Sequence, residues 1–217
     1  MVVGVVHPSR THGALSPIMK QFAEACRRNR EPILEVLRDA LPESGLVFEI
    51  GCGTGQHAAY FGEHLPGLDW QPSDVDPASE SICAWRDDAG ADNVRDPFAF
   101  NLFDDDAPID EADAVVCINT IHIAPWEATR RLFEHAADLL PPGGPLFLYG
   151  PFRYDDRVLE ASNKRFDRFL KSRDPESGIR CFDDIDEIAD DVGFELADDV
   201  AMPANNRSIW WELNSEC

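Results

Sequence analysis

The sequence predicts an α/β fold in which a seven-stranded, mostly parallel sheet is wrapped by helices on both faces. Two observations carry this prediction. Short apolar runs alternate with amphipathic helical segments from Leu46 onward, and a glycine-rich turn follows the first apolar run. Such alternation is typical of strand–helix–strand units, whose crossover helices cover a parallel sheet on both sides. At 217 residues the chain is long enough for one domain of this kind.

The expected strands are short apolar runs bounded by turn residues, at 46–50, 69–74, 98–102, 113–118, 145–150, 194–200 and 207–213. Amphipathic patterns predict helices between them at 56–64, 77–88, 126–140 and 184–192. A segment inserted after the fifth strand holds one more expected helix, at 163–172. The last strand is expected to run antiparallel to its neighbours, as half of a final hairpin.

The chain before the first strand is expected to be helical. Residues 1–16 mix Gly, Pro, Ser, Thr and His and are expected to be a flexible N-terminal segment, while residues 17–217 form the single domain. The following stretch, up to Pro42, has apolar residues at helical spacing. Because proline removes a backbone donor, we expect this helix to be interrupted or restarted at Pro32.

The charge of the chain is strongly acidic. There are 41 Asp and Glu against 19 Lys and Arg, a formal net charge of −22, and the only lysines are Lys20, Lys164 and Lys171. Acidic pairs recur along the whole chain, which favours adaptation to a salt-rich cytoplasm, where self-repulsion is screened; an ordinary acidic protein is the alternative. Such a surface also argues against nucleic acid as a partner at low salt.

Targeting and metal signals are weak. No apolar run reaches 18 residues, and the opening MVVGVVH is too short for a secretory signal, so no membrane span and a cytoplasmic location are expected. The 6 cysteines lie far apart, without a C-x-x-C pair or a histidine at zinc-like spacing. We therefore expect reduced thiols and no metal site.

The stretch VFEIGCGTGQHAAYF, residues 47–61, carries the clearest functional signal. A strand that enters a glycine loop and then a helix offers backbone N–H groups to a ligand, and glycine permits close approach. No lysine follows the glycines, which excludes the phosphate loop of nucleotide hydrolases. Gln56 stands where the dinucleotide fingerprint needs glycine, which argues against an NAD-linked oxidoreductase.

The remaining pattern, E-x-G-x-G-x-G, resembles that of the class I S-adenosylmethionine-dependent methyltransferases, which have a Rossmann-like fold. The resemblance implies that Glu49 contacts the amino group of the ligand. It also implies that the loop passes under the methionine and ribose of S-adenosylmethionine, through Gly51, Cys52, Gly53, Gly55 and His57. An acid beside the loop is favourable for a ligand that carries an ammonium and a sulfonium.

Further contacts with this cofactor follow from the same resemblance. A second acid, at the end of the next strand, is expected to accept the ribose hydroxyls, and both Asp74 and Asp76 are candidates. After the third strand, Asn101 and Leu102 are expected at the adenine. The end of the fourth strand adds two more expected contacts, Asn119 and Ile121.

Longer strings resemble a narrower group, the family that includes methyltransferase-like protein 26. They are RNREPILEVL, GTGQHA, WQPSDVD, CINTIHIAPW, YGPF, SNKRFDRFL and MPANN, which together span residues 28–206. Arg28 and Asn29 in the first string are expected in an N-terminal helix that lies over the cofactor. The resemblance strengthens the cofactor assignment and leaves the methyl acceptor open.

The function expected from these residues is methyl transfer to a small molecule or to a side chain of a protein, the small molecule being favoured, with S-adenosylhomocysteine as product; a catalytically silent cofactor-binding partner subunit is the alternative. His122 is the best candidate for a general base, because its ordinary pKa is near neutrality. Tyr149 and Asp167 are the other catalytic candidates. The acceptor is expected to contact Trp126, Phe152, Asn163 and Asn205, and Arg28, Arg153 and Arg180 near the mouth would suit a carboxylate or phosphate.

Overall fold

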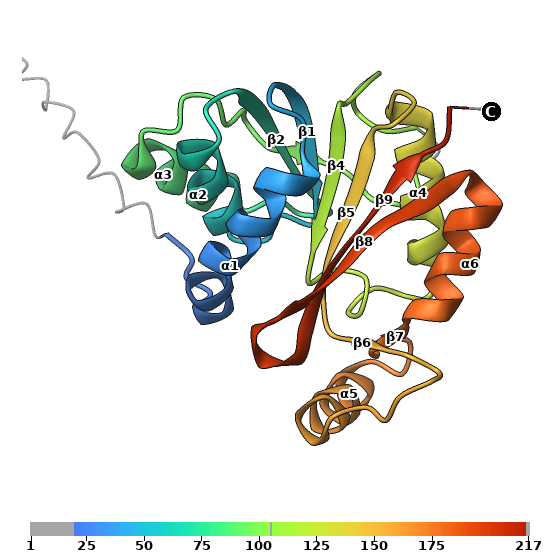
Figure 1. The fold of residues 1–217 in the computed structure, drawn as a ribbon. Helices are drawn as coiled ribbons and strands as arrows, with labels where there is room; N and C mark the ends of the chain where they lie inside the picture. The colour runs from blue at the N-terminus through green and yellow to red at the C-terminus, as the bar shows by residue number, and fades with distance from the viewer. Residues whose placement is uncertain (1–19, 105, 216–217) are drawn as a thin grey trace, which may run out of the picture.

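The computed structural model describes residues 20–104 and 106–215. Seven strands form one sheet in the order β3-β2-β1-β4-β5-β9-β8 (Figure 1). Their bounds are β1 Gly45–Ile50, β2 Leu68–Asp74, β3 Phe98–Ala99, β4 Ala114–Ile118, β5 Pro145–Gly150, β8 Phe194–Met202 and β9 Asn206–Leu213. The first five strands pair in parallel, and β9 runs antiparallel to both β5 and β8. The predicted fold class is confirmed, including the antiparallel last strand.

Helices cover both faces of this sheet, as Figure 1 shows. On one side lie α1 (Glu24–Ala40), α2 (Gln56–His64) and α3 (Ser79–Ala89). The other side carries α4 (Glu127–Leu139) and α6 (Phe182–Val192). The insertion after β5 lies beyond the carboxyl ends of the parallel strands. It contains α5 (Ala161–Arg173) and two short strands, β6 (Phe152–Arg153) and β7 (Arg180–Cys181), that pair with each other.

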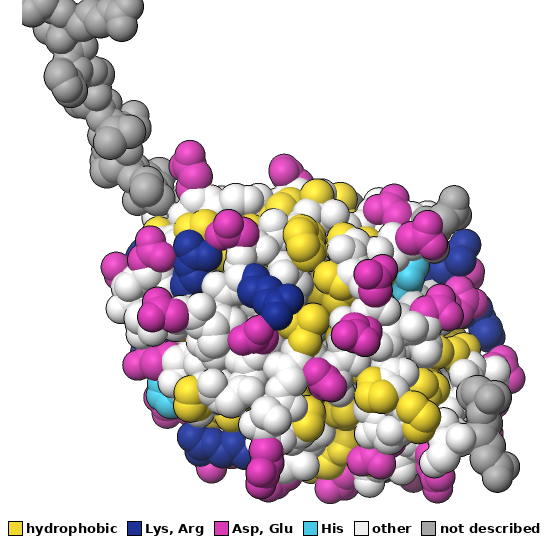
Figure 2. All heavy atoms as spheres, turned by 90° about the horizontal axis from the view of Figure 1, so that it is seen from above, with side chains coloured by type: hydrophobic (Ala, Val, Ile, Leu, Met, Phe, Trp, Pro, Cys, Tyr) yellow, Lys and Arg dark blue, Asp and Glu magenta, His cyan; other side chains and the backbone are white. Residues whose placement is uncertain are grey.

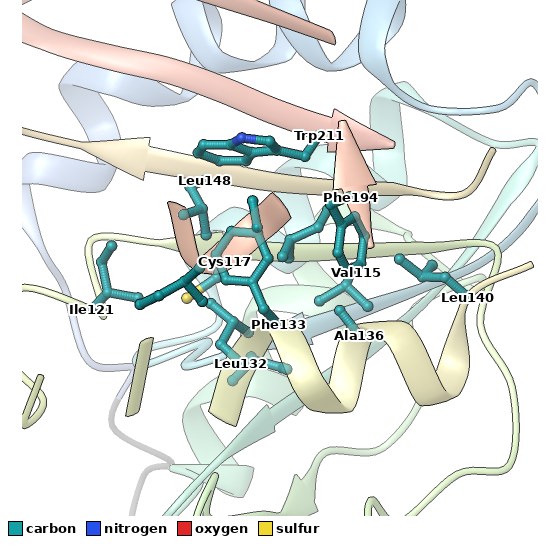
Figure 3. Close-up of a cluster of buried hydrophobic side chains, with 14 of the residues drawn as sticks. Val115, Cys117, Ile121, Leu132, Phe133, Ala136, Leu140, Leu148, Phe194 and Trp211 are labelled. Carbon is teal, nitrogen blue, oxygen red and sulfur yellow. The ribbon is translucent and has the colours of Figure 1, made fainter. Parts of the chain in front are cut away.

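The sheet has a separate hydrophobic core on each face. Successive strand residues point to opposite sides, so Val47 packs toward α1 and α2 while Phe48 packs toward α4. Figure 3 shows the core under α4, where Phe133 meets Phe194 and Trp211 edge to face, with ring centroids 5.5 and 5.4 Å apart. Each such aromatic side chain contributes roughly 1.5–3 kcal/mol by its burial, so this layer holds the sheet that positions the site.

Helix α1 differs from its expected form, because it runs unbroken from Glu24 to Ala40 with Pro32 inside it. Pro32 removes only its own N–H, so one carbonyl, that of Arg28, loses its helical partner. Ile33, Leu34 and Leu37 are buried directly after the proline, and their packing offsets that loss. The expected flexible segment 1–16 lies outside the described residues.

The third strand is shorter than expected, because the chain turns at Asn101 instead of continuing. The side-chain Oδ1 of Asn101 accepts a hydrogen bond from the Phe103 N–H at 3.1 Å, and the backbone carbonyl of Asn101 accepts one from the Asp104 N–H at 2.8 Å. Asparagine favours such local bonds over a strand ladder. The strand therefore ends at Ala99, and residues 100–103 are free to line a site.

Acidic side chains are scattered over the face of the molecule that Figure 2 shows. Figure 2, which looks down from the top of Figure 1, shows Asp and Glu across the whole visible face with only a few Lys and Arg between them. Within the described residues, no helix combines the length and the apolar character that crossing a bilayer requires.

Candidate functional site

A cavity of about 1250 Å³ opens at the carboxyl ends of the parallel strands. This is the edge at which open α/β sheets bind ligands. Its floor is formed by the turns after β1, β2, β4 and β5, and its walls by the first turns of α1, by α5 and by the turn between β8 and β9. These segments meet at the lower end of the sheet in Figure 1.

The glycine loop forms one side of the cavity, and its three glycines have different tasks. Gly51, Gly53 and Gly55 all have positive φ, at 79°, 54° and 81°. A Cβ on Gly51 would lie 2.3 Å from Thr120 Oγ1, and a Cβ on Gly55 would lie 2.7 Å from the Ile82 Cα. A Cβ on Gly53 would meet nothing within 4 Å. Gly51 and Gly55 therefore serve packing, whereas Gly53 presents bare backbone to the cavity.

Asp74, at the end of β2, lies beside this loop. Its Oδ2 accepts a hydrogen bond from the Gly53 N–H at 2.9 Å, and Asp74 lines the cavity. Asp76, two residues on, does not line it. The structure thus brings one of the two candidate acids to the glycine loop, and the side-chain oxygen not bonded to Gly53 remains for a ligand.

Glu49 lies at the base of the same loop but does not line the cavity. Its side chain is buried, and its carboxylate accepts a hydrogen bond from Trp70 Nε1 at 2.8 Å. Burial raises the pKa of Glu49 to about 7, and the charge of Asp74 acts in the same direction, while the bond from Trp70 lowers it. In this structure the carboxylate is a partner of the tryptophan.

Helix α1 is anchored over the cavity by a buried histidine of α2. His57 Nε2 donates to Asn29 Oδ1 at 2.9 Å, and its ring stacks on Phe61 with centroids 5.4 Å apart. Burial lowers the pKa of His57 to about 4, and the nearby Arg30 charge adds to that effect, so the ring is neutral at pH 7. Arg28, Asn29 and His57, three of the expected cofactor contacts, all line the cavity.

Tyr149, at the end of β5, joins this network. Its hydroxyl accepts a hydrogen bond from Asn206 Nδ2 at 3.1 Å. Burial raises the pKa of Tyr149, against the bonds from Asn29 and Asn206, so the phenol keeps its proton at neutral pH. The sequence pointed instead to the neighbouring Asn205, which does not line the cavity; its Nδ2 donates to Oγ of the wall residue Ser162 at 2.9 Å.

The turn after β4 carries the expected base. Asn119 has a positive φ of 56°, a conformation that costs a non-glycine residue roughly 1–2 kcal/mol, and its N–H donates to the Tyr149 carbonyl at 2.8 Å. This bend places His122 in the cavity wall, packed against Gly150, on which a Cβ would lie 3.0 Å from the His122 Cε1. Burial lowers the pKa of His122 to about 4, with a contribution from Arg180. Its imidazole is therefore neutral at pH 7 and free to accept a proton, but it is a weaker base than the near-neutral pKa expected from the sequence would give.

The side expected to hold an adenine is apolar. Phe100, Leu102 and Phe103 line it together with Asn101. The Asn101 Oδ1 already accepts the Phe103 N–H, so this side chain shapes the turn. Backbone and apolar surface of the same segment remain for a flat ring.

Several sequence-predicted residues lie outside the cavity wall. Asp167 accepts a hydrogen bond from the Ile179 N–H at 2.9 Å and forms an ion pair with Lys171 at 2.8 Å. These contacts hold the end of the insertion in place. The Trp126 ring lies under the Arg180 guanidinium, with Cζ of Arg180 5.7 Å from the centroid of the tryptophan ring. Phe152 and Ile121 are buried in the core under α4, where Figure 3 shows Ile121. Their apolar side chains gain more from the core than from a ligand.

Other wall residues were missed. No contact was predicted from the sequence for Cys26, Thr54, Thr120, Ile123, Pro151, Ser162, Phe166, Ala204 or Asn206, which all line the cavity. Phe166 could have been found, because it follows Asn163 by three positions and so shares one face of α5 with it. The turn residues carried no such signal, since their places depend on how distant loops meet.

Comparison with solved structures places the fold. An O-methyltransferase family protein from Burkholderia thailandensis superposes with a TM-score of 0.74 at 20% identity, over 89% of this chain and 59% of that one. An O-methyltransferase family 2 protein from Planctomyces limnophilus, in complex with apigenin, gives a TM-score of 0.74 at 16% identity, over 87% and 59%. Human N-acetylserotonin methyltransferase, in complex with SAM, gives 0.71 at 17%, over 88% and 53%.

These likenesses show the fold: the chain shares the Rossmann-like fold of these methyltransferase structures. It spans somewhat more than half of the length of each of these structures. The family described as "Protein of unknown function (DUF938)" matches residues 20–213, and the chain belongs to it.

Proposed function

We propose that the protein is an S-adenosylmethionine-dependent methyltransferase that acts on a small molecule. One observation carries the proposal: the bare backbone of Gly53 and the carboxylate of Asp74 meet at the wall of a large cavity. At about 1250 Å³ the cavity exceeds the usual 300–1,000 Å³ of a single small-ligand site, so it has room for a cofactor and an acceptor together.

The residues present fit this cofactor. Gly53 permits close approach to the backbone, and the Asp74 carboxylate suits a pair of ribose hydroxyls. The Arg28 side chain supplies a positive charge for a carboxylate, and the apolar segment from Phe100 to Phe103 can cover an adenine. The human neighbour, which is in complex with SAM, supports the choice of cofactor.

When bound, this cofactor supplies a methyl group on a sulfonium; the carbon moves to the acceptor, sulfur keeps the electron pair of the broken bond, and the acceptor loses its proton. The chain has to orient two reactants and receive that proton. His122 is the group we assign to the proton, because its imidazole is neutral at pH 7 and lies in the cavity wall. Tyr149, protonated and held by Asn206, is assigned an orienting contact.

The longer sequence strings support a finer placement beside methyltransferase-like protein 26. All seven strings contain wall residues; WQPSDVD, for example, contains Asp74, and YGPF begins with Tyr149. We propose that these strings mark a shared cofactor site. The acidic composition supports a cytoplasmic location in a salt-rich cell.

Transfer of label tests the proposal. The protein is incubated with S-adenosylmethionine labelled in the methyl group and with a small-molecule extract, and label is followed into compounds other than the cofactor. We expect at least one labelled product with the wild type and none with the Gly53→Val variant or with heat-inactivated protein. Unlabelled extract beside a wild type that binds S-adenosylhomocysteine would contradict transfer and leave binding alone.

A further inference from the structure

We propose that the methyl acceptor is an uncharged, largely apolar small molecule with one hydrogen-bond donor, held between the turn after β4 and helix α5. This inference rests on the proposed function and names the substrate class of the same cavity. It follows from where charges lie around the cavity and from which polar atoms of the acceptor side are already engaged.

Few charged side chains line the cavity. Among the described residues that line it, the only Asp, Glu, Lys or Arg are Arg28, on α1, and Asp74, which accepts a hydrogen bond from Gly53 in the glycine loop. Charged residues make up 28% of the chain, so their scarcity in this wall runs against the composition. The acceptor side, between the turn after β4 and α5, is lined mainly by neutral or apolar residues: His122, Ile123, Pro125, Tyr149, Asn163 and Phe166.

Two of the three arginines expected to receive an anionic substrate, Arg180 and Arg153, are engaged elsewhere. Arg180 donates from Nε to the Ile121 carbonyl at 3.0 Å, and from Nη2 to the carbonyls of Ala124 and Glu176. It therefore holds the turn after β4 from behind. Arg153 pairs with Asp155 at 3.2 Å and with Asp184 at 3.3 Å. Neither of these two arginines lines the cavity. The third, Arg28, does, and the proposed function assigns it to the carboxylate of the cofactor. With Arg28 so used, a carboxylate or phosphate on the acceptor would find no basic partner among the described wall residues.

A cationic acceptor is disfavoured in the same way. Asp167 directly follows the wall residue Phe166 on α5. Its two carboxylate oxygens accept hydrogen bonds from Lys171 Nζ and from the Ile179 N–H. The neighbouring His122 is neutral at pH 7 and offers no compensating charge. An ammonium enclosed here would lose its hydration without gaining an ion pair.

Two contacts remain for a neutral ligand. The Phe166 ring is 37% exposed and stands edge-on to His122 with centroids 6.0 Å apart, so it presents an aromatic face to the cavity. Asn163 is buried, and its Nδ2 donates to the Asn205 carbonyl at 2.9 Å. That bond fixes the carboxamide and leaves Oδ1 to accept from a hydroxyl or N–H of the ligand.

Binding of three matched probes tests the inference without needing turnover. The protein is saturated with S-adenosylhomocysteine in about 1 M KCl, which screens the long-range field of the acidic surface. Calorimetry then compares 2-naphthol, 2-naphthoate and 2-naphthylmethylammonium, which share one ring system and differ in charge. We expect the neutral probe to bind at least about tenfold more tightly than either ion, because neither ion finds a partner.

Two variants on one helix locate the site. Phe166→Ala is expected to weaken 2-naphthol binding by about tenfold, because it removes the aromatic wall, and to leave S-adenosylhomocysteine affinity unchanged. Phe169→Ala is the matched control, since Phe169 lies on the same helix, is exposed and does not line the cavity. It should change neither affinity.

The outcomes separate the two proposals. Failure of S-adenosylhomocysteine to bind would overturn the proposed function. If it binds, but an ionic probe binds as tightly as 2-naphthol, or 2-naphthol does not bind, the uncharged acceptor is wrong while the cofactor site stands. Equal effects of the Phe166 and Phe169 substitutions on 2-naphthol would also contradict the placement on α5.

Discussion

The N–H of Gly53 donates a hydrogen bond to Oδ2 of Asp74 at 2.9 Å, across the gap between the turns after β1 and β2. The two strands are neighbours in the sheet, with Glu49 paired to Pro72 and Ile50 to Ser73, so parallel pairing brings their carboxyl ends together. The bond fixes an acid beside a stretch of bare backbone. We propose that this pair holds the sugar of the cofactor.

Gly53→Ala is expected to weaken cofactor binding by at least about tenfold, because the new methyl group would project into space that the ligand needs. The measurement is calorimetry with S-adenosylhomocysteine. Gly90→Ala is the matched control, since Gly90 also has a positive φ, of 65°, and also has nothing within 4 Å of the added Cβ, but lies at the end of α3. If Gly53→Ala and Gly90→Ala bind S-adenosylhomocysteine with equal affinity, position 53 requires glycine for its positive φ and not for close approach of the ligand.

Asp74→Asn is expected to lower affinity for S-adenosylhomocysteine by about 10–100-fold, because charge-assisted bonds to hydroxyls become neutral ones. The amide still fits the space of the carboxylate, so the fold should persist. Asp76→Asn serves as control and should bind as the wild type does, since Asp76 does not line the cavity. If Asp76→Asn weakened S-adenosylhomocysteine binding more than Asp74→Asn did, the ribose contact would belong to Asp76.

His122→Gln is expected to reduce turnover by about 100-fold or more and to leave cofactor affinity nearly unchanged, because glutamine cannot take the acceptor proton. The neutral imidazole persists down to the lowered pKa of His122, about 4, so wild-type turnover should fall only as the pH approaches that value. His64→Gln is the control, since His64 is only partly buried, outside the cavity. A turnover midpoint near 6.5 would contradict this environment for His122.

Glu49→Gln is expected to stabilise the protein without ligand near neutral pH. The folded pKa of Glu49 is raised from 4.5 to about 7, so the unfolded chain releases this proton first and the wild type loses stability as pH rises through that interval. The variant keeps an acceptor for Trp70 Nε1. Its advantage in the free energy of unfolding should grow from near zero at pH 4.5 to about 2–3 kcal/mol at pH 7, measured by urea unfolding. A difference that does not change with pH would show that Glu49 ionises normally.

Rising KCl is expected to raise the melting temperature, because screening weakens repulsion within a chain of net charge −22. Thermal unfolding followed by circular dichroism between about 0.1 and 2 M KCl measures this. A melting temperature that stays level or falls would contradict adaptation to a salt-rich cytoplasm.

The sequence was sufficient for the sheet because its signals are local. Central strands such as β1, β4 and β5 are apolar runs, and the glycines after β1 mark the turn at which the site begins. Two local expectations were wrong. The bond from the Phe103 N–H to Asn101 Oδ1 ended β3 early, and packing of Ile33 and Leu34 carried α1 through Pro32.

The cavity was predictable only in part. Residues fixed by strand ends, such as Gly53, Asp74 and His122, line it, and their predicted contacts with a ligand stay predictions. Residues whose place depends on two distant segments were not found. Asn206 contacts Tyr149 because β9 pairs with β5. Asp167 lies outside the cavity wall and accepts a hydrogen bond from the Ile179 N–H, just before β7. Such pairings leave no trace in spacing along the chain.

Calorimetric titration of the wild-type protein with S-adenosylmethionine and S-adenosylhomocysteine, in about 1 M KCl, tests the central claim most directly. We expect both ligands to bind with one site per chain and with dissociation constants of about 1–100 μM. Absence of heat and of any rise in melting temperature with either ligand, in protein shown to be folded by circular dichroism, would contradict the assignment of the Gly53 and Asp74 site to this cofactor.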